Sequence, residues 1–247
     1  MVGKTAALAL AAVVALAGCA QVSAETVARD AADDLQAAWT GAAGSLQRMD
    51  LRLRMGLGED ASFDLAGAVE LHEDDAVTMT LRVEEARLGD PGAEEAFQDL
   101  GFLLYCSPGR WVLRTEGMAA IGMEDADAET ANSADGCMGG DAGTVGDMQR
   151  LLRDLDPMFA GMIDSLSLEP PPMELVEASW EGDDVLAVYE IRSEGMTMRV
   201  TATIRDDQIV RSEGGFDAGG MGSMSLTTEY HYGPRSADPG LRGAEQV

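Results

Sequence analysis

The sequence predicts an α+β fold in which two helical segments pack on the concave face of one large, curved antiparallel sheet of about ten strands. Two observations predict the sheet: apolar and polar residues alternate with a period of two in about ten segments, and most connections are short and turn-like. A third predicts the helices, because apolar residues recur three and four positions apart in residues 24–49 and 144–166. Each helix therefore has one apolar face, which we expect to cover the sheet.

Residues 1–18 have the composition of a secretory signal, with Lys4 ahead of an apolar run that is too short to span a membrane. The residues Leu16-Ala17-Gly18-Cys19 that follow resemble the lipobox of prokaryotic lipoproteins. The resemblance implies that the Cys19 thiol carries a diacylglyceryl group, that the signal is cut just before it, and that residues 19–24 are a lipidated tether. The alternatives are an ordinary signal with an incidental Cys and an uncleaved anchor.

A lipobox places the rest of the chain outside the cytoplasm. Two or three acyl chains, at ~0.8 kcal/mol per buried CH₂, hold a protein stably on a membrane. We therefore expect an extracytoplasmic, membrane-anchored lipoprotein on the cell surface or the periplasmic face, with membrane lipid as a partner through Cys19. Whether the cell has one membrane or two is left open by the sequence.

The chain is strongly acidic, with a formal net charge of -27 that becomes -28 when its only lysine, Lys4, leaves with the signal. This charge repels nucleic acid and anionic membrane surfaces, so we expect no nucleic-acid partner. It also opposes the compact state at ordinary salt, whereas at ~1 M salt the Debye length falls to about 3 Å and the repulsion is screened. A halophilic source and a cation-binding role are the two explanations.

After the first helix the pattern changes to strands. The period becomes two at residue 50, and polar turns separate successive segments. Residues 89–95 read as a loop, and Ser107-Pro108-Gly109-Arg110 reads as the turn of a hairpin. The predicted strands of this half are 50–57, 63–71, 77–83, 102–106 and 111–114.

Residues 115–146 are the largest break in the pattern, because they are acidic, rich in Ala and Gly and almost free of large apolar residues. Loops of this length are usually functional or disordered. The alternating acids from Asp125 to Glu129 invite a calcium interpretation, but an EF-hand loop would need Gly at Thr130 and Glu at Gly136. A solvated acidic loop is favoured over a cation site.

Cys106 and Cys137 are the only cysteines besides Cys19. In an exported chain two remaining thiols most simply form a disulfide, which would fasten the acidic loop to the end of a strand. On the loop-entropy model this bridge would stabilise the fold by roughly 3.5 kcal/mol. Two free buried thiols are the alternative, and zinc is not indicated because no His lies near them in the sequence.

The second half of the chain repeats the order of helix and strands. In the helical region 144–166, Pro157 is expected to kink or split the helix. Short connections make the later strands antiparallel neighbours. Residues 25–234 are thus expected to form a single domain and residues 235–247 a disordered tail. The predicted strands of this half are 175–180, 185–192, 196–205, 208–216 and 223–232.

Several local stretches resemble known proteins. They are the first helix running into Met49-Asp50-Leu51-Arg52-Leu53, the hairpin from Leu104-Tyr105 to Trp111, the strand from Val200 to Ile204 with Asp206-Asp207-Gln208-Ile209-Val210, and Tyr230-His231-Tyr232-Gly233-Pro234. With the order of elements, they make most of residues 25–234 similar to the LolA and LolB lipoprotein carriers and to lipid-binding lipoproteins of the LppX and LprG type. The resemblance implies an incomplete β-barrel that holds acyl chains under a helical lid. The acidic loop and its cysteines depart from that pattern, and no individual lipid-contacting residue is matched.

The inventory of catalytic groups is small. The only histidines are His72 and His231, and neither has the companions of a zinc site or of a nucleophile motif. His72 follows a strand and precedes Glu73, so we expect it at the surface. No Gly-rich loop opens a helix after a strand, as nucleotide binding would require. We therefore expect no enzymatic activity, no metal and no cofactor.

Two functions fit the sequence, and we expect a monomer in both. The first is the binding of an apolar ligand, a lipid or a lipoprotein acyl chain, for carriage or transfer. The second is a non-enzymatic structural or interaction lipoprotein of the cell surface with a filled core. A cavity above about 300 Å³ lined by Met and Leu would favour the first. The residues expected to line it are Met79, Leu81, Trp111, Leu113, Met162, Met196 and Met198.

The two explanations of the acidic composition predict different responses to salt. If the fold is adapted to salt, its Tm should rise steadily as NaCl is raised to ~1 M, because screening grows throughout that range. KCl is the matched control, since screening depends on ionic strength and should give the same rise. Differential scanning calorimetry of the purified protein measures both series. A rise complete at low concentration and confined to one cation would instead indicate a specific cation site.

Overall fold

The computed structural model describes residues 23–39, 46–57, 61–73, 76–98, 100–118, 127–130, 173–193, 196–217 and 223–240. The helices among these residues are α2 (Ala24–Trp39) and α3 (Pro91–Gln98). The strands are β1 (Leu46–Leu57), β2 (Ala61–Leu71), β3 (Val77–Arg87), β4 (Gly101–Ser107), β5 (Arg110–Glu116), β6 (Asp127–Thr130), β7 (Met173–Glu181), β8 (Asp184–Ser193), β9 (Met196–Arg205), β10 (Gln208–Asp217) and β11 (Ser223–Tyr232).

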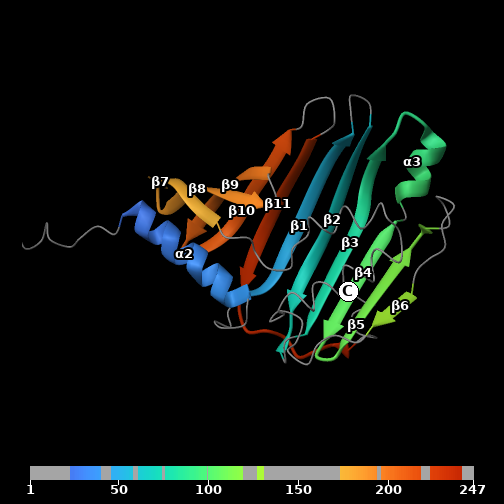
Figure 1. Cartoon of the computed structure of the whole chain (residues 1–247), viewed down its shortest axis with the longest axis horizontal. Helices are drawn as coiled ribbons and strands as arrows, with labels where there is room; N and C mark the ends of the chain where they lie inside the picture. Colours follow the sequence, from blue (N-terminus) through green and yellow to red (C-terminus); the bar gives the residue numbers. More distant parts are fainter. Residues whose placement is uncertain are drawn as a thin grey trace, which may run out of the picture.

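The strands form one open antiparallel sheet in the order β6-β5-β4-β3-β2-β1-β11-β10-β9-β8-β7. Two meanders, β1 to β6 and β7 to β11, are joined through the pairing of β1 with β11. Figure 1 shows β7, β8 and β9 turned strongly relative to β1–β5, so the sheet changes direction across its width. The predicted α+β fold on one large antiparallel sheet is confirmed.

One strand was not expected from the sequence. β6 lies inside residues 115–146, which the sequence predicts as a loop, and it pairs antiparallel with β5 at the edge of the sheet. The segment is only four residues long and contains two acids, so its alternation is too short to distinguish a strand from a polar loop. The expectation that all of 115–146 is loop is wrong at these four residues and at Thr115 and Glu116, which end β5.

Helix α2 begins as predicted and ends earlier. Ser23 caps it, since the Ser23 hydroxyl accepts a hydrogen bond from the Thr26 amide at 3.1 Å. Its apolar stripe is buried, but Leu46 and Met49, which share the same spacing, belong to β1. The expected helix over 24–49 is therefore wrong at residues 46–49. Gly41 and Gly44 in the intervening sequence disfavour helix by about 1 kcal/mol each, and pairing of β1 with two neighbours favours the strand.

Helix α3 replaces most of the loop expected at residues 89–95. Asp90 caps it by accepting the Gly92 amide at 3.0 Å, and Pro91 occupies the first helical position, where proline is favoured. Glu94 folds back to accept the Leu88 amide at 2.8 Å. The Phe97 ring packs on Phe63 of β2 with a centroid distance of 5.2 Å.

The predicted helix over residues 144–166 lies outside the described residues. In the part of the chain that the structure describes, neither helix has the length and apolar character needed to cross a membrane.

The segment that follows β11 contacts the end of α2, the start of β1 and strand β4. The Arg235 guanidinium donates to the carbonyl oxygens of Ala38 at 2.8 Å and Leu46 at 3.2 Å, which joins the end of α2 to the start of β1. The Tyr105 hydroxyl donates to Asp238 at 2.8 Å. Residues 235–240, which the sequence places in a disordered tail, are thus hydrogen-bonded to the sheet and to α2.

His72 is buried, with 2% of its surface exposed, so its expected place at the surface is wrong. Its Nδ1 lies 2.9 Å from the Ser236 hydroxyl and its Nε2 lies 2.9 Å from the Thr78 hydroxyl. The returning segment around Ser236 covers the ring. A residue 164 positions away supplies this cover, and no local pattern in the sequence points to it.

The buried His72 predicts a pH dependence of stability. Burial lowers the pKa of His72 below its ordinary value of 6.5, although the charges of Glu70 and Asp238 oppose the change. At a pH between the lowered pKa and 6.5, the unfolded chain binds a proton at His72 and the folded chain does not. The contribution of His72 to the free energy of unfolding is therefore full above pH 6.5 and decreases as the pH falls below that value.

We expect His72→Gln to remove this part of the decrease between pH 7.5 and about 5, measured by urea unfolding. Thr78→Val is the matched control, because it deletes one hydrogen bond of the ring and keeps the titrating group. Both variants should lose stability at every pH, by about 1–3 kcal/mol for a buried polar group left without its partner. Equal pH dependence in the parent protein and in His72→Gln would refute the assignment.

Candidate functional site

The sheet has an apolar inner face, defined here as the face on which α2 packs, and a charged outer face. The strand register aligns apolar side chains of successive strands in one row on the inner face. Going from β5 to β11, the row consists of Leu113, Leu104, Met79, Val69, Met49 and Tyr230. The outer face carries ion pairs instead, such as Arg54 with Asp64 at 2.7 Å and Arg205 with Asp184 at 2.6 Å.

Helix α2 covers the inner face over the second meander. It packs on β7, β8, β9 and β10 and on the start of β1. Its buried stripe contains four alanines, at positions 28, 31, 32 and 38, which let the helix backbone approach the strands closely. At Ala28 the carbonyl oxygen accepts a hydrogen bond of 2.6 Å from the hydroxyl of the buried Tyr189 in β8. Burial raises the pKa of Tyr189 to about 12, so this hydroxyl keeps its proton.

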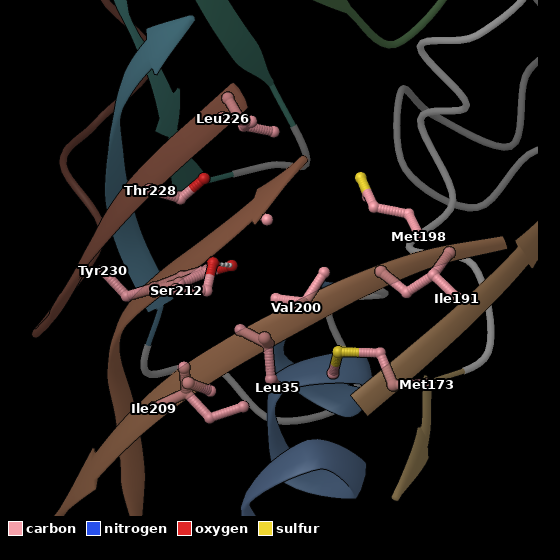
Figure 2. A pocket seen from close by; sticks show the side chains of 12 residues that line it. Leu35, Met173, Ile191, Met198, Val200, Ile209, Ser212, Leu226, Thr228 and Tyr230 are labelled. Carbon is pink, nitrogen blue, oxygen red and sulfur yellow. Dashed lines mark hydrogen bonds between the residues drawn. The ribbon is translucent and has the colours of Figure 1, made fainter. Parts of the chain in front are cut away.

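An apolar pocket with a volume of about 140 Å³ lies between α2 and the inner face of β7–β11. Figure 2 shows its wall, with Leu35 of α2 below, Met173 and Met198 on one side, and Tyr230 and Thr228 on the other. No charged side chain is among the lining residues. These are Leu35, Met173, Ile191, Met198, Val200, Ala202, Ile209, Ser212, Gly214, Leu226, Thr228 and Tyr230.

Small residues leave room for the pocket. Ala202, Ser212 and Gly214 sit on neighbouring strands β9 and β10, where larger side chains would fill the space. Gly214 is also required by the backbone, because a Cβ there would lie 2.8 Å from Val200 Cγ2 and 3.1 Å from the Arg199 carbonyl oxygen. The small residues of β9 and β10 thus form part of the pocket's shape, in addition to the way α2 packs on the sheet.

Three hydroxyl groups are the polar side chains of this pocket. The Ser212 and Tyr230 hydroxyl oxygens lie 3.0 Å apart, and Thr228 is the cross-strand partner of Ser212 (Figure 2). Burial raises the pKa of the Tyr230 phenol, while hydrogen bonds with Ser212 and Thr228 oppose the change. The three groups are therefore neutral at physiological pH.

The residues expected to line a cavity occupy different parts of the inner face. Met198 lines the pocket. Trp111, Leu113 and Met79 pack together in the core over the first meander, and Leu81 belongs to a second apolar cluster with Leu65 and Val83. The backbone of Met196, the first residue of β9, pairs with Ser193 of β8, and Met162 lies outside the described residues. Their role as a ligand wall stays a prediction.

Most pocket residues were not singled out from the sequence. Ile191, Leu226 and Thr228 stand at alternating strand positions, so period two assigns them to a face without saying what packs above it. The signal that could have found them is the small residues Ala202 and Gly214 within apolar strands, because such residues mark close approach or open space.

The cysteines are only partly described. Cys106 lies at the end of β4 with 1% of its surface exposed and is disulfide-bonded. Cys137, its predicted partner, and Cys19 lie outside the described residues, so the pairing and the lipidation stay predictions.

On the outer face, the charged side chains around His231 pair with one another. His231 Nε2 lies 2.7 Å from Asp50, which also accepts from Arg48 at 2.7 Å, and Arg48 donates to Glu70 at 2.6 Å. Within the described ranges, no three His, Cys, Asp or Glu side chains converge in a way that could hold a metal ion.

Comparisons with known proteins found similar solved structures but no matching sequence family. No protein-family model matches the chain, and no curated protein matches it.

Among solved structures, LprF from Mycobacterium bovis is similar over 86% of this chain and 96% of its own, with 10% identity and a TM-score of 0.35. A LolA superfamily protein from Nitrosomonas europaea covers 92% and 100%, with 9% identity and a TM-score of 0.32. A putative outer membrane lipoprotein-sorting protein domain from Vibrio parahaemolyticus covers 74% and 83%, with 9% identity and a TM-score of 0.27. Because these scores are low, fold and site rest on the contacts described above.

Proposed function

We propose that this protein is an extracytoplasmic, membrane-anchored lipoprotein that binds an apolar ligand, a lipid or a lipoprotein acyl chain, for carriage or transfer. The observation that carries the proposal is the apolar pocket between α2 and the second meander, whose wall contains Met173 and Met198 and no charged side chain. Methionine side chains are flexible and polarisable, so they adapt to apolar ligands of different shape.

The size of the pocket limits what it holds. Its volume of about 140 Å³ is below the ~300 Å³ at which ligand pockets usually begin, so it does not reach the size that was expected to favour ligand binding over a filled core. It is close to that of dry apolar cavities of about 150 Å³ that bind a molecule as small as benzene. The pocket therefore fits a section of one acyl chain. At ~0.8 kcal/mol per CH₂, four or five buried methylenes would contribute about 3–4 kcal/mol.

The position of α2 supports a role near a membrane. Ser23 caps the helix, and Cys19 stands only four positions earlier. Even fully extended, residues 19–23 span at most about 18 Å. Leu35, which lines the pocket, lies about 18 Å along the helix from Ser23. A lipidated Cys19 would therefore hold the pocket within a few tens of ångströms of the bilayer.

An interaction lipoprotein with a filled core is the second candidate. The exposed side chains of Val176 and Trp180, at 47% and 46%, favour it, because both stand on the edge strand β7 where a partner could dock. This candidate predicts that the purified protein carries no apolar ligand.

Occupancy of the pocket distinguishes the two candidates. Solvent extraction and native mass spectrometry of the full chain should recover an apolar ligand. The variant Ala202→Val should bind this ligand with roughly tenfold lower occupancy, because the added methyl groups take the space of about two ligand carbons. Ala187→Val is the matched control: Ala187 is the buried cross-strand partner of Ala202 and does not line the pocket.

Unfolding midpoints of both variants should be measured alongside, since overpacking costs about 1–3 kcal/mol in either position. Absence of any apolar ligand, or equal loss of ligand in the two variants, would count against binding in this pocket.

The membrane anchor has its own test. Cys19→Ser should move the protein from the membrane fraction to the soluble fraction, because the thiol that carries the acyl groups is gone. Cys137→Ser is the control with the same substitution elsewhere, and it should stay with the membrane. The intact mass of the processed protein should exceed that of residues 19–247 by the mass of the lipid. An unmodified mass would remove the anchor from the proposal.

A further inference from the structure

The pocket contains a polar feature that an acyl chain alone does not need. Ser212, Thr228 and Tyr230 bring three hydroxyl groups to one side of an otherwise apolar wall, on the adjacent strands β10 and β11. Figure 2 shows the Ser212 and Tyr230 hydroxyls meeting beside Val200, with the Thr228 hydroxyl above them. Binding pockets for small molecules commonly combine an apolar wall with a few placed polar groups that fix orientation.

The three hydroxyl groups of this cluster can form more hydrogen bonds than they form with one another. Each hydroxyl supplies one proton and two acceptor positions. The contact between Ser212 and Tyr230 at 3.0 Å uses one proton, and a hydrogen bond between Thr228 and Tyr230 uses a second. One proton of the three is left over. When Ser212 and Thr228 both donate to Tyr230, the remaining proton is that of the Tyr230 phenol, which belongs to a pocket-lining side chain.

We propose that the cluster of Ser212, Thr228 and Tyr230 selects an apolar chain that carries one uncharged hydrogen-bond acceptor, such as the carbonyl oxygen of an acyl ester. This inference rests on the proposed function, because it names the ligand class of the same pocket. The apolar wall receives the chain, and the remaining hydroxyl proton is donated to the ester carbonyl.

A charged ligand is disfavoured at the same place. None of the residues that line the pocket carries a charge, so a carboxylate there would lose its hydration without gaining a cationic partner. The net charge of the chain, -27, adds repulsion. An esterified acyl chain fits this environment, and a free fatty acid in its ionised form does not.

Three short probes of similar size test the proposal: heptane, methyl hexanoate and hexanoate. The full-length chain should carry Cys19→Ser in all samples, so that no acyl group of its own competes. Binding is followed by NMR through the methyl resonance of Met198, which lines the pocket and can be assigned with Met198→Leu.

We expect Tyr230→Phe to weaken methyl hexanoate about fivefold, the effect of one neutral hydrogen bond, and to leave heptane within about twofold. Ser212→Ala should act in the same direction. Tyr232→Phe is the matched control, because its hydroxyl donates to the Ile209 carbonyl oxygen at 2.8 Å and Tyr232 does not line the pocket. Hexanoate should not shift the Met198 resonance at concentrations that saturate with the ester.

Failure of the inference is distinguishable from failure of the proposed function. If heptane and methyl hexanoate both bind, and Tyr230→Phe changes neither affinity, the pocket binds apolar ligands and the selection by hydroxyl groups is overturned. If hexanoate binds as tightly as the ester, the restriction to uncharged ligands is overturned. If no probe shifts the Met198 resonance, binding in this pocket is refuted and the inference falls with it.

Discussion

The rest of the structure depends on the pairing of β1 with β11. Every other pairing in the sheet joins strands that are neighbours in sequence, so without this ladder the chain would hold two separate meanders. Helix α2 reinforces the junction, because it precedes β1 in the chain and packs on β7–β10 of the other meander. Arg235 completes it by binding the Ala38 and Leu46 carbonyls from the segment that follows β11. The pocket depends on this junction because it lies between α2, which precedes β1 in the chain, and the strands β7–β11 of the second meander.

The sequence predicted the sheet well because the side-chain period of a strand is local information. It predicted the bounds of the helices less well. Leu46 and Met49 continue the helical spacing of α2, but they lie in β1, which is hydrogen-bonded to β2 and β11. The capping residues Asp90 and Pro91 were a usable signal for α3. The burial of His72 and the pocket could not be predicted, because both depend on segments distant in sequence that cover a face. Met198 was anticipated in the wall, whereas Ser212 and Gly214 are informative only once β9, β10 and α2 are in place.

Charge and apolarity are separated by the same strand alternation. The outer face carries arginine–carboxylate pairs such as Arg52 with Glu84, and exposed pairs of this kind contribute only about 0–1 kcal/mol each. They leave the excess of 44 acids over 17 bases largely unbalanced. The residues that line the pocket carry no charge, so this excess of acids lies outside the pocket. Salt is thus expected to change the stability of the fold much more than the affinity of a neutral ligand in the pocket.

The hydroxyl cluster also bears on how the pocket remains stable without ligand. An isolated buried hydroxyl would cost about 1–3 kcal/mol if it found no partner. Here Ser212 and Tyr230 bond to each other at 3.0 Å, so most of that cost is offset inside the protein before any ligand arrives. A ligand carbonyl then has to add one hydrogen bond and break none. A purely apolar wall at these positions would bind chains of any headgroup alike, so the three hydroxyls make sense as a means of selection at little cost to the fold.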